Sequence, residues 1–187
     1  SNPEWMRPMV GVAPRSGHHL HMLAFDIGRG PEGHWWVLGD RAQAPSGAGF
    51  ALETRMAAAR SFPGQVTQAN VARLAGFFRG FRDALLALRA EEDSRVAILT
   101  PGPLNDTYFE HAYIARYLGF LLVQGEDLVV RDGRLMVHTV GGLKAISVLW
   151  RRLDSAWLDP LELNEDSQIG TPGILSALRA GQLTMVN

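Results

Sequence analysis

The stretch RVAILTPGPLNDTYFEHAYIARYL, residues 95–118, indicates an α/β fold. Its first part, RVAILTP, is a short apolar run, which is typical of a strand buried on both faces of a sheet. A Pro-Gly loop follows, and a helical pattern then runs from about Tyr108 to Leu118. A strand that leads through a short loop into a helix is the repeating unit of α/β sheets.

Further strand patterns follow this helix. The first is the apolar run FLLVQGEDLVV. A hairpin with Asp132-Gly133 at the turn is predicted by VVRDGRLMVH, and a buried strand that ends in charged residues is predicted by GLKAISVLWRR. GILSALRAG predicts a short helix that stops near Gly181, and QLTMVN predicts one more strand. We therefore expect a Rossmann-like layer over residues 93–150, and we expect the natural protein to continue beyond Asn187.

The sequence before residue 95 predicts a hairpin, a loop and a long helix. Residues 19–40 have two apolar and aromatic arms around GRGPEG, which favours a hairpin. Residues 41–55 are rich in small residues and have no clear period, so we interpret them as a loop. Residues 66–90 have apolar side chains at three- and four-residue spacing, which predicts a surface helix packed on the sheet.

The composition excludes several classes of function. The chain has 187 residues, and its net charge of −1 comes from 18 basic and 19 acidic side chains. This balance gives no reason to expect binding to nucleic acid or to a membrane surface, and no apolar run is long enough to span a bilayer. The absence of cysteine excludes disulfides and thiolate metal sites, and it fits a cytoplasmic protein. Nothing in the sequence favours a particular oligomeric state.

The first candidate site follows RVAILTP. In open α/β sheets, ligands bind beyond the carboxyl ends of strands. Gly102 allows a ligand to approach the backbone closely, and the polar residues 105–107 can cap the helix that follows. Glu110 suits the helix dipole, and the adjacent His111 can bind an anion or a carboxylate. From the residues alone, this turn is either an ordinary helix start or a ligand-binding loop.

The second candidate site carries Arg151, Arg152 and Asp154 after a buried strand. Because side chains alternate along a strand, the two arginines should point to opposite faces, so that one can be solvated while the other enters a cleft. Arginine is suited to bidentate recognition of carboxylate or phosphate. A structural ion pair with Asp154 or Asp159 explains the same residues equally well.

Two other motifs give weaker signals. APSGAG, residues 44–49, is a loop whose backbone N–H groups could hold phosphate or carboxylate, but it matches neither the P-loop nor the dinucleotide fingerprint. GHHLH contains three histidines, and His19 and His21 would share one face of a strand. No well-spaced third ligand is evident, so we do not expect a zinc site.

Four blocks of the sequence together resemble a known family. They are residues 33–55, 98–135, 146–163 and 170–187. These blocks look like the circularly permuted type 2 ATP-grasp proteins, which are bacterial relatives of glutathionylspermidine synthase and eukaryotic glutathione synthetase. The match begins near Val12 and covers only the middle of the family's length. It lacks an N-terminal segment and the C-terminal part that would carry most nucleotide-binding lysines and the Gly-rich lid.

The resemblance implies both a fold and an activity. Residues 66–187 would form a Rossmann-like (pre-ATP-grasp) α/β sheet with flanking helices, and residues 1–65 would be a β-hairpin and Gly/Ser loop from the ATP-grasp part. The implied activity is a carboxylate-amine ligase, which makes an amide and ADP through an acyl phosphate. ATP and magnesium would serve the full-length protein, and we expect none in this fragment, which would be inactive alone. The implied partners are a small-molecule or peptide-like substrate and the remaining domains of the same polypeptide.

The resemblance also implies a set of substrate- or phosphate-binding residues. They are Asp40, Arg41, Ser46, Gly47, Glu53, Arg55, Tyr108, Glu110, His111, Arg151, Arg152 and Asp154. The family's magnesium-binding Glu-x-Asn corresponds to Gly39-Asp40-Arg41, where glycine has no side chain and arginine cannot ligate a cation, so no metal ligand is expected. This departure favours an alternative, a non-catalytic binding or scaffold module that has lost its magnesium site.

Overall fold

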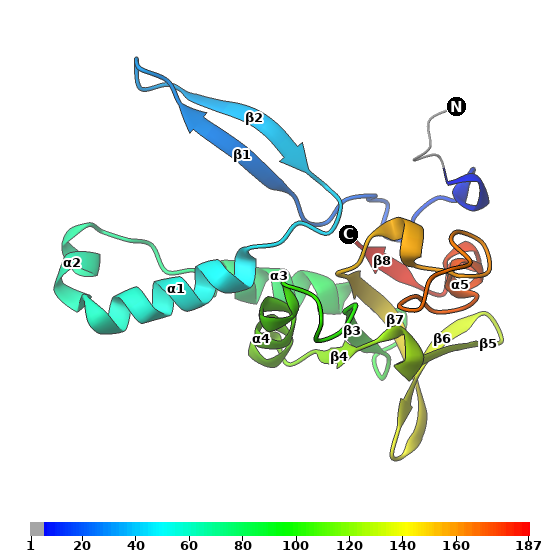
Figure 1. Ribbon diagram of the computed structural model, residues 1–187. Coiled ribbons are helices and arrows are strands. Elements are labelled where there is room, and N and C mark those ends of the chain that lie inside the picture. The colour runs from blue at the N-terminus through cyan, green and yellow to red at the C-terminus, as the bar shows by residue number, and fades with distance from the viewer. Residues whose placement is uncertain (1–5) are drawn as a thin grey trace.

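The computed structural model describes residues 6–187 and has an α/β architecture (Figure 1). The first five residues of the predicted 1–65 unit lie outside the described chain. The strands and helices are β1 (Ala24–Arg29), β2 (Trp35–Arg41), α1 (Ala48–Ser61), α2 (Pro63–Gln68), α3 (Ala75–Ala87), β3 (Arg95–Leu99), α4 (Tyr108–Leu118), β4 (Leu121–Val123), β5 (Leu128–Arg131), β6 (Arg134–Thr139), β7 (Gly142–Arg151), α5 (Ile174–Arg179) and β8 (Thr184–Val186). No helix among these residues has the length and apolar character that a membrane crossing requires.

A six-stranded mixed sheet forms the body of the molecule, in the order β4-β3-β7-β6-β5, with β8 also paired to β7. β3 runs parallel to β4 and to β7, and β8 runs parallel to β7, whereas β5 and β6 are antiparallel. The continuous apolar runs in β3 and β7 are buried as the sequence predicts. Leu99 pairs with Arg151, so the carboxyl ends of β3 and β7 lie side by side.

Helices cover both faces of this sheet. On one face, α5 packs over Leu149 and Leu153. On the other face, α1, α3 and α4 contribute side chains that pack around Trp150. Successive residues of β7 therefore belong to different cores, and this alternation sets the directions of the two arginines that follow.

The hairpins and short elements agree with the sequence patterns. β5 and β6 join through Asp132 and Gly133, which both have positive φ (50° and 72°), as a tight hairpin turn requires. The first hairpin is also present, and β1 and β2 project away from the main sheet (Figure 1). The predicted helix near the carboxyl end is α5, and the predicted last strand is β8. These predictions are confirmed.

Three expectations upstream of β3 are wrong. Residues 41–55 are not all loop, because α1 begins at Ala48, and its alanine-rich sequence favours a helix without an amphipathic period. The single helix over residues 66–90 is interrupted between α2 and α3, where Asn70 adopts a left-handed conformation with φ of 48°. His19 and His21 precede the first residue of β1, so they lie in a loop and share no strand face.

Candidate functional site

His111 lies buried between the loop after β3 and the first turn of α4. Its Nδ1 is 2.9 Å from the Thr100 hydroxyl, its Nε2 is 3.0 Å from the Thr107 hydroxyl, and the side chain is buried. Burial is the main cause that lowers the pKa of His111 to about 4, and the positive charge of Arg152 lowers it as well. At neutral pH the imidazole is therefore uncharged, and two hydroxyls hold its orientation.

Glu110 connects this turn to the start of α1. Its carboxylate accepts the Gly47 N–H at 3.0 and 2.8 Å and the Gly49 N–H at 3.0 Å, and the residue has 0% exposure. These are the N–H groups that the sequence offered for phosphate or an external carboxylate. A protein carboxylate already caps the helix N-terminus, where negative charge is favourable.

Arg152 completes this buried cluster. Its Nη2 donates to the Pro45 carbonyl at 2.7 Å and pairs with Glu110 at 3.2 Å, so its ion-pair partner is Glu110 and not Asp154 or Asp159. Its guanidinium carbon lies 5.2 Å from the centre of the Trp150 ring. Nε and Nη1 are buried and have no hydrogen-bond partner among residues 6–187. The hydrogen-bonding capacity of these two nitrogens is unused within the described residues.

Arg151 points to the opposite face, as the alternation predicts, but the expectation that one of the two arginines is solvated is wrong, because both are buried. Its Nη1 donates to the Leu153 carbonyl at 2.5 Å, and its Nη2 donates to Gln43 Oε1 at 2.8 Å. The amide nitrogen of Gln43 in turn donates to Asp154 at 3.0 Å and to Ser155 at 2.8 Å. Within the described chain, Arg151 forms no direct ion pair with a carboxylate.

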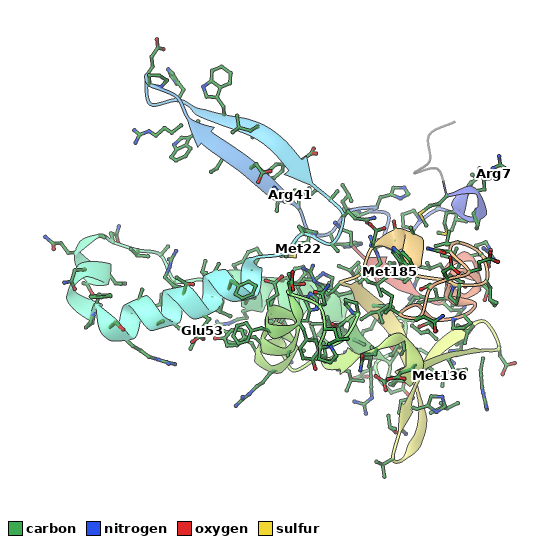
Figure 2. All side chains as sticks on the ribbon, viewed as in Figure 1. Arg7, Met22, Arg41, Glu53, Met136 and Met185 are labelled. Carbon is green, nitrogen blue, oxygen red and sulfur yellow. The ribbon has the colours of Figure 1, made fainter. Side chains whose placement is uncertain are left out.

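The structure brings together only part of the predicted site. The segments that meet at the ends of β3 and β7 contribute six of the predicted residues, namely Ser46, Gly47, Tyr108, Glu110, His111 and Arg152. Arg41 lies on the hairpin, where it forms an exposed ion pair with Asp26 at 3.0 Å, and Glu53 lies on α1 (Figure 2). Asp40 is exposed on β2, and Arg55 donates to the Ala72 carbonyl. These four residues do not join the buried cluster.

The residues of the Gly39-Asp40-Arg41 segment do not fit a magnesium ion. Gly39 has no side chain that could ligate a cation, Asp40 offers one exposed carboxylate, and the Arg41 guanidinium is paired to the carboxylate of Asp26. In the described part of the chain, no three His, Asp or Glu side chains group as metal ligands. A divalent cation prefers several oxygen ligands, which this segment does not supply.

Sequence reasoning missed several residues that hold the site in place. Thr100 and Thr107 bind His111, Gln43 binds Arg151, and Asn187 ties β8 to the base of the hairpin. The Asn187 side chain accepts from the His21 and Met22 N–H groups and donates to the Ala42 carbonyl. The only signal of these roles in the sequence is a polar residue at the end of an apolar run. The contacts themselves cannot be predicted from a local pattern, because they join segments that are distant in the chain.

The close approach of α1 to α4 makes Gly49→Ala a sharp test of this geometry. An added Cβ would lie 2.7 Å from Glu110 Cβ and 3.0 Å from Glu110 Cα, so one helix must move. We expect the free energy of unfolding to fall by about 1–3 kcal/mol in urea denaturation. The matched control is Gly80→Ala in α3, which meets nothing within 4 Å and should stabilise the chain by about 0.5–1 kcal/mol. Equal effects at both positions would contradict the packing.

Comparison with known proteins gives a consistent result. A family model described as circularly permuted ATP-grasp type 2 matches residues 1–187. Uncharacterized protein Rv2567 of Mycobacterium tuberculosis (strain H37Rv) is 38% identical over 189 residues, which are 100% of this chain and 21% of that protein. Uncharacterized protein Rv2411c of the same strain is 36% identical, with 96% of this chain and 33% of that protein covered. Uncharacterized protein sll0335 of Synechocystis is 34% identical, with 98% and 38% covered.

Proposed function

The chain belongs to the circularly permuted ATP-grasp type 2 family, as the sequence blocks predict, and we propose that it is part of a peptide-type ligase. The family implies an ATP-dependent ligase-type function. In the proposed reaction, a carboxylate takes the terminal phosphoryl group of ATP, an amine attacks the acyl carbon, and phosphate leaves as the amide forms. The chain spans 21–38% of the length of the relatives described above, so this activity is proposed for a longer protein.

The observation that carries this proposal is the buried Arg152 at the carboxyl end of β7. It retains two nitrogens, Nε and Nη1, without hydrogen-bond partners among residues 6–187, and it lies against the loop that contains Ser46. A buried guanidinium with free donors is suited to a carboxylate or phosphoryl oxygen. Glu110 and His111 have their polar atoms occupied by protein groups. We therefore assign them to positioning Arg152 and the loop, and we assign substrate contact to Arg152 and Ser46.

We also propose that residues 1–65 belong with the ATP-grasp part and residues 66–187 form the substrate-side unit, a boundary that falls within α2. The hairpin supports this division, because it projects from the sheet with exposed apolar side chains (Figure 1). Exposures of 66% for Trp35, 63% for Trp36 and 73% for Leu38 are unusual for a free surface. The occupant that we propose for this surface is the remainder of the same polypeptide, since the relatives are much longer than this chain.

A second candidate function is a binding or scaffold module without catalysis. The observation that favours it is the Gly39-Asp40-Arg41 segment, which has neither side chain of the family's Glu-x-Asn magnesium pair. Under this alternative, Gly39→Glu with Arg41→Asn would restore the ligand pair without restoring turnover. Turnover by the unmodified full-length protein would eliminate this alternative.

The variant that tests the role of Arg152 is Arg152→Lys in the full-length protein. Lysine keeps the positive charge beside Glu110 but lacks the Nε and Nη1 donors. The assay measures ADP release in the presence of mixed carboxylate and amine substrates. We expect kcat/KM of Arg152→Lys to be about 10–100-fold lower than that of the unmodified protein, because charged hydrogen bonds contribute about 1.5–3 kcal/mol. Arg116→Lys, on the exposed face of α4, is the control and should leave kcat/KM unchanged. An unchanged Arg152→Lys enzyme would exclude Arg152 from substrate contact.

A further inference from the structure

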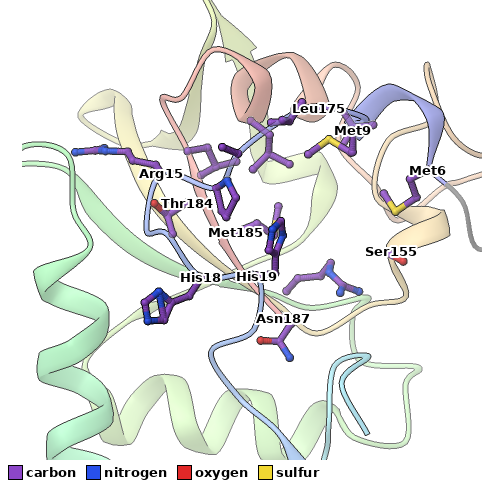
Figure 3. Close-up of a pocket in the computed structure, with 16 residues that line it drawn as sticks. Met6, Met9, Arg15, His18, His19, Ser155, Leu175, Thr184, Met185 and Asn187 are labelled. Atoms are coloured by element: carbon purple, nitrogen blue, oxygen red, sulfur yellow. The ribbon is translucent and has the colours of Figure 1, made fainter.

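A cavity lies on the α5 face of the sheet, away from the Glu110–Arg152 cluster. Its volume is about 260 Å³, and residues before β1, on α5 and on β8 form its walls (Figure 3). A cavity of about 150 Å³ already accommodates benzene, so this one has room for a ligand with a short apolar body. His18 and His19 are exposed and lie in its lining, so the cavity opens to solvent beside them.

Most of the lining is apolar. Met9, Leu175, Leu178 and Leu183 contribute side chains to it, together with Val12. Apolar walls with a few polar groups are typical of sites for small organic molecules. The body of a ligand in this cavity would therefore be hydrocarbon.

The buried charged group in this lining is Arg151. Its hydrogen-bond partners in the described chain are neutral, namely the Leu153 carbonyl and the Gln43 amide oxygen. The acid linked to Arg151 through this network is Asp154, which contacts Gln43 and not Arg151; burial lowers the pKa of Arg151, and the charge of Asp154 offsets only part of that effect. A buried cation without a direct counter-charge is costly, and an anion in the cavity would offset this cost.

Thr184 adds a second polar group to the same wall. It lines the cavity, and its hydroxyl is buried with no hydrogen-bond partner among residues 6–187. The hydroxyl itself has almost no accessible surface, so Thr184 does not by itself select a ligand. The charge preference of the cavity therefore comes from Arg151, whose guanidinium favours an anion over a cation.

We propose that this cavity binds a small carboxylate with an apolar body, with the carboxylate at Arg151 and the hydrocarbon against α5 and β8. The two adjacent arginines then serve different sites, because Arg152 is paired with Glu110 on the opposite face of the sheet. This inference does not rest on the proposed ligase function. Its test uses no ATP, so its failure and a failure of the ligase proposal are distinguishable.

The test is calorimetric titration of the full-length protein with hexanoate, hexanamide and hexylamine as probes. We expect hexanoate to bind with a Kd of about 0.1–1 mM, at least tenfold tighter than hexanamide, and hexylamine not to bind. Arg151→Gln should abolish the preference for hexanoate over hexanamide. Arg15→Gln, which removes an exposed charge from the same lining, should change the hexanoate affinity by less than about twofold.

Ala13→Phe keeps the test decisive if Arg151→Gln fails to fold. Ala13 is an exposed residue of the lining, so we expect a larger side chain there to narrow the cavity without disturbing the core. We expect this variant to lose hexanoate binding and to retain its thermal stability. The proposal would be overturned if hexanoate and hexanamide bound with equal affinity. It would also be overturned if hexanoate binding changed in Arg15→Gln but not in Arg151→Gln, or if it were unchanged in Ala13→Phe.

Discussion

Glu110→Ala is expected to lower the free energy of unfolding by about 3–5 kcal/mol, because it leaves Arg152 as an unpaired buried charge. The substitution also removes the acceptor for the Gly47 and Gly49 N–H groups at the start of α1. Both side chains of the Glu110–Arg152 pair are almost fully buried, with exposures of 1% and 3%. Urea denaturation followed by tryptophan fluorescence measures the change.

The control for Glu110 is Glu165→Ala, at an exposed position in the loop before α5. We expect that substitution to change stability by less than about 0.5 kcal/mol. The double variant Glu110→Ala/Arg152→Met should cost less than the sum of the two single changes, because it leaves no unpaired charge. A loss below about 1 kcal/mol in Glu110→Ala would show that the buried pair does not hold α1 to α4.

The second large effect is a loss of stability in acid caused by His111. Its folded pKa of about 4 lies below the ordinary value of 6.5. Between these values the unfolded chain binds a proton that the folded chain excludes, so stability falls as the pH falls from 6.5 to 4. Above 6.5 the residue is neutral in both states and has no effect. The shift corresponds to about 3 kcal/mol at 1.36 kcal/mol for each pKa unit.

The measurement is the free energy of unfolding between pH 7 and pH 4 for the unmodified chain and for His111→Gln. We expect the variant to lose the part of the slope that His111 contributes, although its stability at pH 7 falls because the Thr100 and Thr107 contacts change. The control is His138→Gln, which replaces a histidine at an exposed position on β6, outside the buried cluster. Parallel curves for the unmodified chain and His111→Gln would contradict this account.

The parts of the fold with strong local patterns were predictable from the sequence. A local sequence pattern predicts each of these parts, namely the apolar runs of β3 and β7, the helical period of α4 and the Asp132-Gly133 turn. α1 was missed because its alanine-rich sequence lacks a clear apolar face, and only Gly49 and Leu52 are buried. The break between α2 and α3 depends on one left-handed residue, Asn70, within an otherwise continuous helical pattern.

The candidate site was predictable only as far as the strand ends. Alternation along β7 correctly places Arg151 and Arg152 on opposite faces. The sequence could not indicate that Glu110 would cap a helix 61–63 residues earlier in the chain, because such contacts depend on how the helices pack. The cavity beside Arg151 depends in the same way on where the segment before β1 lies.

The most direct test of the central claim is calorimetric titration of the full-length protein with ATP, in the presence and absence of magnesium. The ligase account predicts saturable ATP binding by the unmodified protein, despite Gly39 and Arg41 in the segment that resembles the family's magnesium site. A Gly39→Glu/Arg41→Asn variant measured beside it shows whether that segment sets the magnesium dependence. If the unmodified full-length protein binds no ATP under either condition, the chain is not part of an ATP-dependent ligase.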